Sequence, residues 1–236
     1  MAFLSWISDQ DLLEAYQLLY DAIERGIKKT EENLGRNIID PFSTVFTLMF
    51  FKFDAQKWQA MEVFRQNEKA LSNAIGAFHQ HILGCVEGWQ NLGTESVVDI
   101  VNDERKIIAE IKNKYSTVKG SEKINIYKSL KDSIYDKRSK YQGYQAYYVT
   151  MIPRKPEGIC KPFTPSDNKN GKKPPEDNAI MEIDGKRFYT LVTGSETALE
   201  DLFNAIPKIV AANHCHLKID GASITFVKKL FDDAYN

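Results

Sequence analysis

The chain has 236 residues and a net charge of −1, and 43% of its residues are hydrophobic. A chain of this length buries enough apolar surface to fold without disulfides or metal ions as staples. We find no apolar run of the ~20 residues that a membrane helix needs and no basic flank before the short apolar start, so we expect a cytoplasmic protein without membrane span or signal peptide. The three cysteines, Cys85, Cys160 and Cys215, are odd in number and widely spaced, which indicates reduced thiols.

The N-terminal third of the chain has the periodicity of amphipathic helices. Apolar residues recur at helical spacing over residues 9–29, directly after the capping residue Ser8. Pro41 begins a second helix that runs towards Phe51, and residues 56–89 contain one or two more. We expect the aromatic side chains of this third in core or dimer packing rather than in a base-stacking platform.

Residues 97–114 have the pattern of a β-hairpin. Two apolar, β-branched runs flank a polar break at residues 102–105. A turn centred on residues 103 and 104 places Asp99 opposite Ile108 on the facing strand.

The period of two along a strand then puts Glu110 and Lys112 on the same face as Asp99. Two carboxylates and an amine converge there from adjacent strands. Diagonal neighbours on a sheet are roughly 7–8 Å apart at the backbone, a gap that one metal ion can bridge. The alternative is a half-buried hairpin with a solvated charged face.

Basic residues are concentrated in residues 105–173, which contain 17 Lys and Arg against 6 Asp and Glu, whereas the rest of the chain contains 14 against 26. Such asymmetry is typical of a DNA-facing segment beside an acidic outer surface. A solvated basic helix followed by a polar loop is the alternative. Because the basic segment begins at the hairpin, we favour DNA binding.

A helix and a strand follow the hairpin. Ser121 is the predicted cap of a helix over residues 122–140, and Gly143 ends it. Residues 144–152 are aromatic and β-branched, which predicts a central strand. Six of the eight prolines then fall between residues 153 and 175, together with Asn168 and Gly171, in a long loop that we expect to be functional.

Asp184-Gly185 predicts a two-residue hairpin turn between strands at residues 180–183 and 186–192. A helix over residues 196–212, a short strand and a last helix complete the chain. We therefore expect an α/β fold with a mixed central β-sheet flanked by helices. It forms a single domain over residues 1–236, with a mainly helical part, 1–92, and a catalytic and DNA-recognition core, 93–236.

An acid, a turn and then Glu-x-Lys resembles the motif of the PD-(D/E)xK nuclease superfamily, with Val98 in place of the usual proline. The resemblance implies a restriction-endonuclease-like core in which Asp99 and Glu110 hold Mg²⁺. The cation would activate water and neutralise charge on the phosphate, while Lys112 orients that water or stabilises the phosphorane.

Further short motifs occur in order over roughly residues 1–210. They are Asn37–Phe42, Glu62 with Arg65-Gln66, Asn73–Gly76, Phe78–Gln80, Glu110–Thr117, Tyr147–Val149, Asp184-Gly185 and Thr193-Gly194. In these motifs the chain resembles type II restriction endonucleases of the group that cuts GGNCC or GGWCC sites, the kin of SinI and AvaII. The resemblance implies a homodimer that cuts double-stranded DNA, with a cognate DNA methyltransferase in the same system but no stable complex with it.

The family pattern also has a glutamate at Glu62, on a helix before the catalytic strands, which could join the metal site. A surface salt bridge to Arg65 or Lys69 is the alternative, and Glu68 is a second acid in this region. Structural zinc is not expected, because the His79/His81 and His214/His216 pairs lack a second cluster at zinc spacing. His79 belongs to the family motif and is assigned a packing or phosphate role.

Guanine-rich half-sites require paired donors to O6 and N7 in the major groove. Arg154, Lys155 and Lys161, after the central strand, are the candidates for this role. The candidates for contacts to the phosphate backbone follow the catalytic strand, and they are Asn113, Lys114, Thr117 and Lys119. Two other functions remain open: a PD-(D/E)xK nuclease of repair or junction resolution, and a non-catalytic DNA-binding module.

Overall fold

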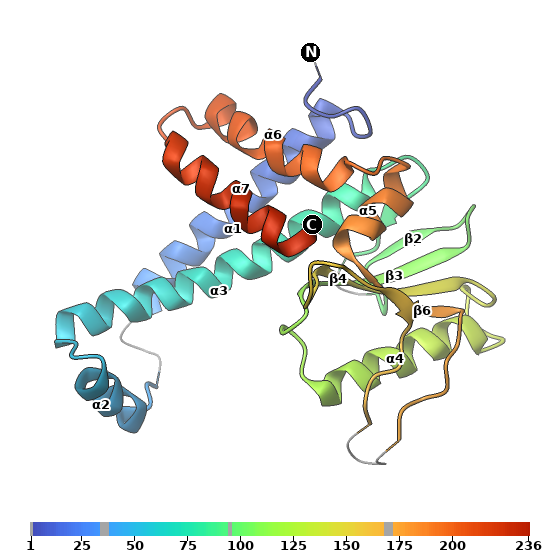
Figure 1. Cartoon of the computed structure of the whole chain (residues 1–236), viewed down its shortest axis with the longest axis horizontal. Helices are drawn as coiled ribbons and strands as arrows, with labels where there is room; N and C mark the ends of the chain where they lie inside the picture. The colour runs from blue at the N-terminus through green and yellow to red at the C-terminus, as the bar shows by residue number, and fades with distance from the viewer. Residues whose placement is uncertain (1, 34–37, 94–95, 168–171) are drawn as a thin grey trace. The chain divides into compact units, whose positions relative to one another are not determined.

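The structure, a computed structural model, describes residues 2–33, 38–93, 96–167 and 172–236 (Figure 1). Three residues of the sequence patterns, Asn37, Asn168 and Gly171, lie outside the described residues. The chain divides into two compact units, one of Met1–Ala15 with His79–Asn236 and one of Tyr16–Phe78. Over the described ranges, no helix has both the length and the apolar character needed to cross a membrane.

The predicted helices of the N-terminal third are confirmed. They are α1 (Asp9–Asn33), α2 (Pro41–Phe50) and the single long helix α3 (Ala55–Gly84). Ser8 caps α1, since its hydroxyl accepts a hydrogen bond of 3.0 Å from the Asp11 amide, and the Asp40 side chain caps α2. Within the unit of residues 16–78, Gly26 lies against Ala70, and a Cβ at Gly26 would come 2.6 Å from the Ala70 Cβ. The glycine therefore allows α1 and α3 to approach closely.

The unit that contains the hairpin is built on a six-stranded mixed sheet of order β1-β2-β3-β4-β6-β5. The strands are β1 (Gln90–Asn91), β2 (Ile100–Asn102), β3 (Ile107–Lys114), β4 (Gln145–Ile152), β5 (Cys160–Pro162) and β6 (Ile180–Asp184). β2 and β3 form the predicted hairpin, whereas β3, β4 and β6 are parallel neighbours. The strand predicted after residue 143 is therefore central, and residues 148–151 along it are buried, so both of its faces are covered there.

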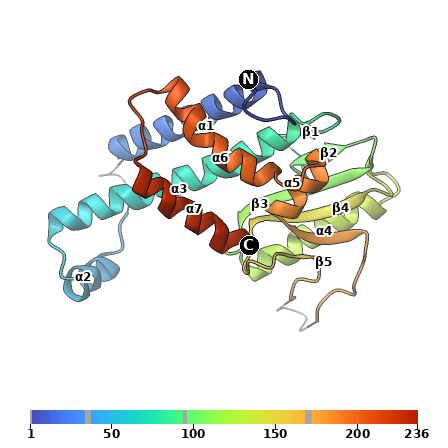
Figure 2. The ribbon, with the colours of Figure 1, turned by 45° about the horizontal axis from the view of Figure 1, so that its top comes forward.

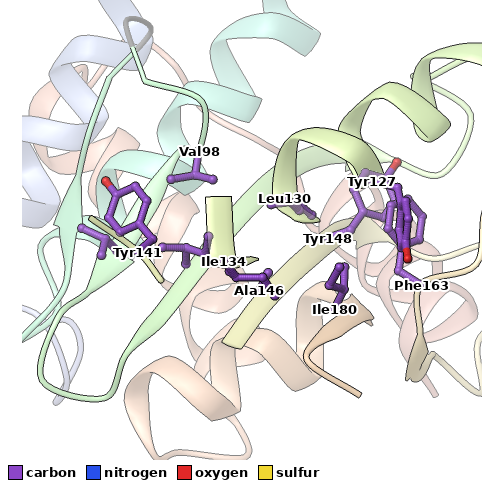
Figure 3. Close-up of a cluster of buried hydrophobic side chains, with 11 residues drawn as sticks. Val98, Tyr127, Leu130, Ile134, Tyr141, Ala146, Tyr148, Phe163 and Ile180 are labelled. Carbon is purple, nitrogen blue, oxygen red and sulfur yellow. The ribbon is translucent and has the colours of Figure 1, made fainter. Parts of the chain in front are cut away.

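Helices cover both faces of this sheet, as Figures 1 and 2 show. α4 (Gly120–Tyr135) packs on one face, and α5 (Gly185–Thr193) packs on the other, followed by α6 (Ala198–Asn213) and α7 (Gly221–Tyr235). In the core beneath α4, the rings of Tyr148 and Phe163 stack at 4.4 Å, in the same buried cluster as Leu130, Ile134 and Ile180 (Figure 3). The predicted fold class, a mixed central sheet flanked by helices, is confirmed.

The bounds predicted for the helix after the hairpin are wrong at both ends. α4 begins at Gly120, with Lys119 rather than Ser121 at the cap position, and it ends at Tyr135 rather than near residue 140. After the helix the chain folds back, and Tyr141 is buried in the core. Gly143, at φ +77°, donates its amide to the Ile134 carbonyl at 2.9 Å and directs the chain into β4.

The hairpin turn predicted at Asp184-Gly185 is also wrong, because α5 begins there. The Asp184 side chain caps the helix by accepting from the Arg187 amide at 3.0 Å, and Phe188, Tyr189 and Val192 are buried at helical spacing. Gly185 is required by close packing, since a Cβ at this position would lie 2.5 Å from the Met151 carbonyl oxygen of β4. The short strand expected before the last helix is absent from residues 214–220, all of which are described.

Candidate active site

The hairpin brings the three predicted catalytic residues together in a register that differs from the prediction. Ile100 pairs with Ala109 and Asn102 with Ile107, so the turn is centred on residues 104 and 105, one residue later than predicted, and each residue of β2 pairs two positions further along β3. Asp99 lies just outside this ladder, because its amide donates at 2.9 Å to the carbonyl of Ala109, which is already the partner of Ile100. Asp99 is therefore beside Ala109 rather than opposite Ile108, and its charge still acts on Glu110 and Lys112. Within the ladder, a shift by two positions keeps each side chain on its face.

The carboxylate of Asp99 is hydrogen-bonded to the neighbouring strand β3. The residue immediately precedes β2, and its Oδ2 accepts a hydrogen bond of 2.6 Å from the Ile111 amide of β3. Burial raises the pKa of Asp99 above its usual value, against the opposing effects of the Ile111 amide, the charge of Lys112 and a hydrogen bond from Gln80. The hydrogen bond thus orients the carboxylate, but neighbouring groups do not fully offset the cost of burying its negative charge.

Glu110 and Lys112 project from the same face of β3 and form an ion pair, with Nζ 2.7 Å from Oε1. Burial and the charge of Asp99 raise the pKa of Glu110, although Lys112 opposes this. For Lys112, burial favours the neutral amine, but Glu110, Asp99 and Glu122 outweigh it and raise the pKa above its usual value. Lys112 is therefore a cation that donates hydrogen bonds at neutral pH.

Asp99 and Glu110 fit a small divalent cation. Burial raises the pKa of both acids, and the charge of Asp99 adds to this effect at Glu110, so a cation between the two would remove the electrostatic cost of ionising them. Mg²⁺ is commonly held by one or two carboxylates and keeps several waters. In the described part of the chain, no cluster of three or more His, Cys, Asp or Glu side chains offers a fully protein-made metal site.

Glu62 forms a salt bridge with Arg65, as in the alternative to a metal-binding role. It lies on α3, in the unit of residues 16–78, and its side chain is buried. Arg65 donates to both carboxylate oxygens at 2.7 and 2.8 Å, and Gln66 donates to Oε1 at 2.8 Å. The hydrogen bond from Arg65 lowers the pKa of Glu62. Both oxygens of this carboxylate are therefore already engaged.

A groove of about 1020 Å³ lies beyond the carboxyl ends of β3 and β4. Arg154, Lys155 and Lys161, the predicted guanine readers, all line it and are exposed. Thr150 also lines it, and because Thr150 is the register partner of Lys112, the groove begins one strand away from the ion pair. Sequence reasoning missed Lys123, another cation in this groove, whose ammonium lies 5.7 Å from the centre of the Tyr148 ring.

The predicted backbone-contacting residues lie at the end of β3 and in the turn that follows. Lys114, Thr117 and Lys119 are exposed, and Asn113 is partly buried. The Thr117 hydroxyl donates to the Lys114 carbonyl at 2.5 Å, which shapes this turn. Their neighbours, Tyr115, Ser116, Val118 and Gly120, line the groove.

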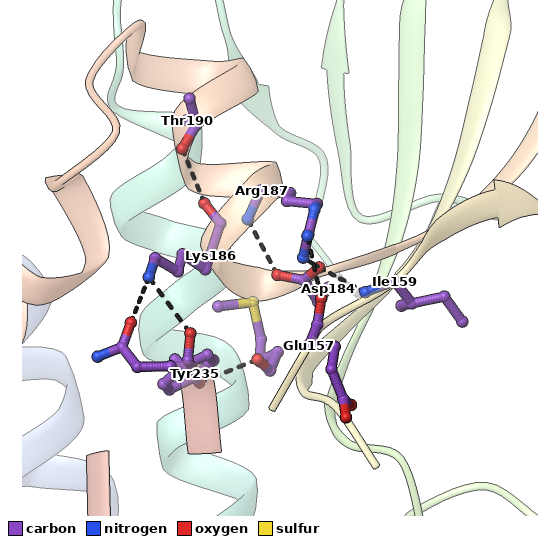
Figure 4. A network of polar contacts seen from close by, with 9 residues as sticks. Glu157, Ile159, Asp184, Lys186, Arg187, Thr190 and Tyr235 are labelled. Atoms are coloured by element: carbon purple, nitrogen blue, oxygen red, sulfur yellow. Dashed lines mark hydrogen bonds and ion pairs between the residues drawn. The ribbon is translucent and has the colours of Figure 1, made fainter. Parts of the chain in front are cut away.

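The loop that carries Arg154 and Lys155 is anchored by a buried carboxylate (Figure 4). Asp184 accepts from the Ile159 amide at 2.8 Å and from the Arg187 guanidinium at 2.7 Å. Arg187 also donates to the Glu157 carbonyl at 3.0 Å. The loop is thereby connected to the start of α5. Sequence reasoning missed this network because Asp184 was assigned to a turn.

His79 packs rather than binding a metal. Its Nδ1 lies 2.9 Å from the Tyr189 hydroxyl, and the two rings meet edge to face at 5.8 Å. Burial lowers the pKa of His79 to about 4, so the ring is neutral at physiological pH. The neighbouring Gln80 is the residue of this motif that acts on the site, through its hydrogen bond to Asp99.

Comparison with known proteins identifies the family. The family model of the Eco47II restriction endonuclease matches residues 4–213. The chain is 41% identical over 210 residues to the type II restriction enzyme Eco47II of Escherichia coli, covering 89% of this chain and 87% of that enzyme. It is 32% identical over 209 residues to the type II restriction enzyme Sau96I of Staphylococcus aureus, covering 87% and 78%. The chain therefore belongs to the Eco47II family and is a type II restriction endonuclease.

Proposed function

We propose that this restriction endonuclease is a Mg²⁺-dependent enzyme of the PD-(D/E)xK superfamily. In this proposal Asp99 and Glu110 hold the cation, and Lys112 acts on the attacking water. The observation that supports it is the convergence of two partly buried carboxylates and one ammonium at the β2–β3 hairpin, with Lys112 2.7 Å from Glu110.

When bound, Mg²⁺ would lower the pKa of a water molecule and neutralise charge on the scissile phosphate. The remaining chemistry belongs to the side chains. Against the effect of burial, Glu110, Asp99 and Glu122 raise the pKa of Lys112, which favours its ammonium form. As an ammonium it would donate hydrogen bonds that orient the water and stabilise the negative charge of the transition state.

For recognition, we propose a palindromic GGNCC or GGWCC site that is cut by a homodimer, since a two-fold symmetric site matches a two-fold symmetric protein. Arg154, Lys155 and Lys161 would supply donors to guanine from the groove beyond β4. Asn113, Lys114, Thr117 and Lys119 would contact phosphates. Residues 1–236 would act as one endonuclease domain, and a cognate methyltransferase would protect the host site. A role for Glu62 at the metal would require its pairing with Arg65 to break.

The experiment is digestion of a sequenced plasmid with Mg²⁺, followed by mapping of the fragment ends. Cleavage at one short sequence in plain duplex is expected. Cleavage only at junctions or lesions would favour the repair alternative, and binding without cleavage would favour the DNA-binding module. Asp99→Ala, Glu110→Ala and Lys112→Ala should each abolish cleavage. Substantial cleavage by any of these folded variants would contradict the assignment of the site.

The proposed reading of guanine is tested by affinity measurements in Ca²⁺. Arg154→Ala should cost about 1–3 kcal/mol on the intact site and much less on a site already altered at the contacted base. A loss of the same size on every sequence would mean that this loop positions the duplex and that base reading lies elsewhere.

A further inference from the structure

α2 presents its apolar side outward. Phe42, Val45, Phe46, Met49 and Phe50 recur at i, i+3, i+4, i+7 and i+8, the spacing with which a helix normally faces a core. All five are exposed by 51–76%, and no residue of α2 is buried. We call these five residues, together with Phe51, the apolar face of α2.

The polar residues of the helix point the other way. Ser43 and Thr47 line a cavity of about 900 Å³ with residues of α1 and α3 in the same unit. A helix that covers a polar cavity with its hydroxyls and exposes its phenylalanines is arranged opposite to an ordinary surface helix. The arrangement is expected where another surface covers the apolar face.

The size of the apolar face matches one side of a protein interface. A phenylalanine buries about 150–250 Å² when it is fully covered, and four of them here are exposed by 55–76%. With Val45 and Met49, on the order of 700 Å² of apolar surface is left open on one copy. A standard stable interface buries about 800 Å² per partner.

The charges at the two ends of α2 suit a second copy of the same helix. The helix itself contains no charged residue, which disfavours nucleic acid as the occupant. Asp40 stands at its N-terminus and Lys52 lies two residues beyond its C-terminus. In an antiparallel pair of α2 helices related by a two-fold axis, the Asp40 end of each helix lies beside the Lys52 end of the other, and the helix dipoles are opposed.

We propose that the apolar face of α2 is the surface through which two copies of this chain dimerise. The proposal rests on the homodimer of the proposed function and assigns its contact surface. Each face is self-complementary about the two-fold axis, with stacked Phe46 and Phe50 at its centre, 5.9 Å apart between ring centroids.

The test is sedimentation velocity over a range of protein concentrations, without DNA. Wild type should be a dimer at micromolar concentration, and Phe46→Glu should raise the dimer dissociation constant at least about 100-fold, because a charge would be buried at the centre of the contact. Phe46→Leu should retain the dimer. Lys52→Glu should weaken it severalfold at low salt, since like charges would then meet at the helix ends.

The control is Phe226→Glu on α7, where a phenylalanine is exposed by 62% beside other apolar residues of α6 and α7. This variant should remain a dimer. A monomeric wild type, a dimeric Phe46→Glu, or dissociation caused by Phe226→Glu instead would each overturn the proposal. Flotation of a monomeric wild type with vesicles of phosphatidylcholine and phosphatidylglycerol would assign the face to a lipid surface.

The outcome is separable from that of the proposed function. The oligomeric state is measured without substrate, and circular dichroism checks that each variant is folded. If Asp99→Ala cleaved DNA while Phe46→Glu was monomeric, the catalytic assignment would fail and the dimer surface would stand.

Discussion

At the scale of single residues, ionisation of the two acids of the candidate site has an electrostatic cost. Burial raises the pKa of Asp99 and of Glu110, and the charge of Asp99 raises that of Glu110 further, so the folded protein binds protons at these acids more readily than the unfolded chain. Charge at these positions therefore reduces the free energy of unfolding at neutral pH. In the proposed metal site, a bound cation would remove this cost.

Asp99→Asn should keep the melting temperature in EDTA unchanged or raise it, because the amide oxygen can still accept from the Ile111 amide while the buried charge is gone. Wild type should be stabilised by Mg²⁺ or Ca²⁺, and the variant should respond much less. Thermal unfolding with and without the cation measures both effects. An equal stabilisation of the two proteins would place the metal elsewhere.

The pKa of His79 is lowered by burial, so its contribution to stability changes with pH in the opposite direction to that of the two acids. Its pKa is lowered to about 4 in the folded protein from about 6.5 in the unfolded chain, so the unfolded state binds the extra proton first. Stability should fall as the pH falls from about 6.5 to about 4, by at most about 1.4 kcal/mol per pH unit from this residue. Denaturant unfolding of wild type and His79→Gln over this range isolates the effect, and parallel curves would contradict it.

At the scale of elements, one buried carboxylate connects β6, α5 and the loop of Arg154. Asp184 caps α5, pairs with Arg187 and accepts from the Ile159 amide, while Arg187 reaches the Glu157 carbonyl. Gly158, at φ +68°, is needed in this arrangement, since a Cβ there would lie 1.8 Å from the Arg187 guanidinium. The loop is thus positioned by Asp184 and Arg187, which lie later in the chain.

Arg187→Ala should loosen this loop, because it removes two hydrogen bonds and leaves the Asp184 carboxylate less satisfied, at a cost of about 1–3 kcal/mol. Trypsin cleavage after Arg154 should become faster. Arg138→Ala, which removes an exposed ion pair with Asp136, is the matched control and should leave the rate unchanged. No change in either variant would mean that the backbone alone holds the loop.

At the scale of the whole molecule, charge is divided along the chain. Residues 105–173 carry a net charge of +11 in a protein whose total is −1. This segment contains β3, the turn after it and the loop that lines the groove. DNA should therefore be bound through this segment despite the negative total.

Lys119→Ala should weaken binding about equally on specific and random duplexes. It should also reduce the slope of log affinity against log salt by about 0.9, since each phosphate contact releases about one counterion. Salt titrations in Ca²⁺, which should permit binding without cleavage, measure the slope. Lys228→Ala on α7 is the control outside the basic segment. An unchanged slope for Lys119→Ala would place that residue away from the DNA.

The sequence by itself determined the periodic parts of this protein: the three N-terminal helices, the hairpin and the central strand. It also determined that Glu110 and Lys112 share a face of β3, because side chains alternate with a period of two in any register. Tertiary structure decided the rest. The position of Asp99 depends on its hydrogen bonds to Ala109 and Ile111 of β3, and the start of α5 depends on a cap and on close packing against Met151. The contact of Glu62 with Arg65 depends on side-chain geometry within one helix. The contacts of Gln80 with Asp99 and of Asp184 with Ile159 join residues that are far apart in the sequence. No local sequence pattern predicts either kind of contact.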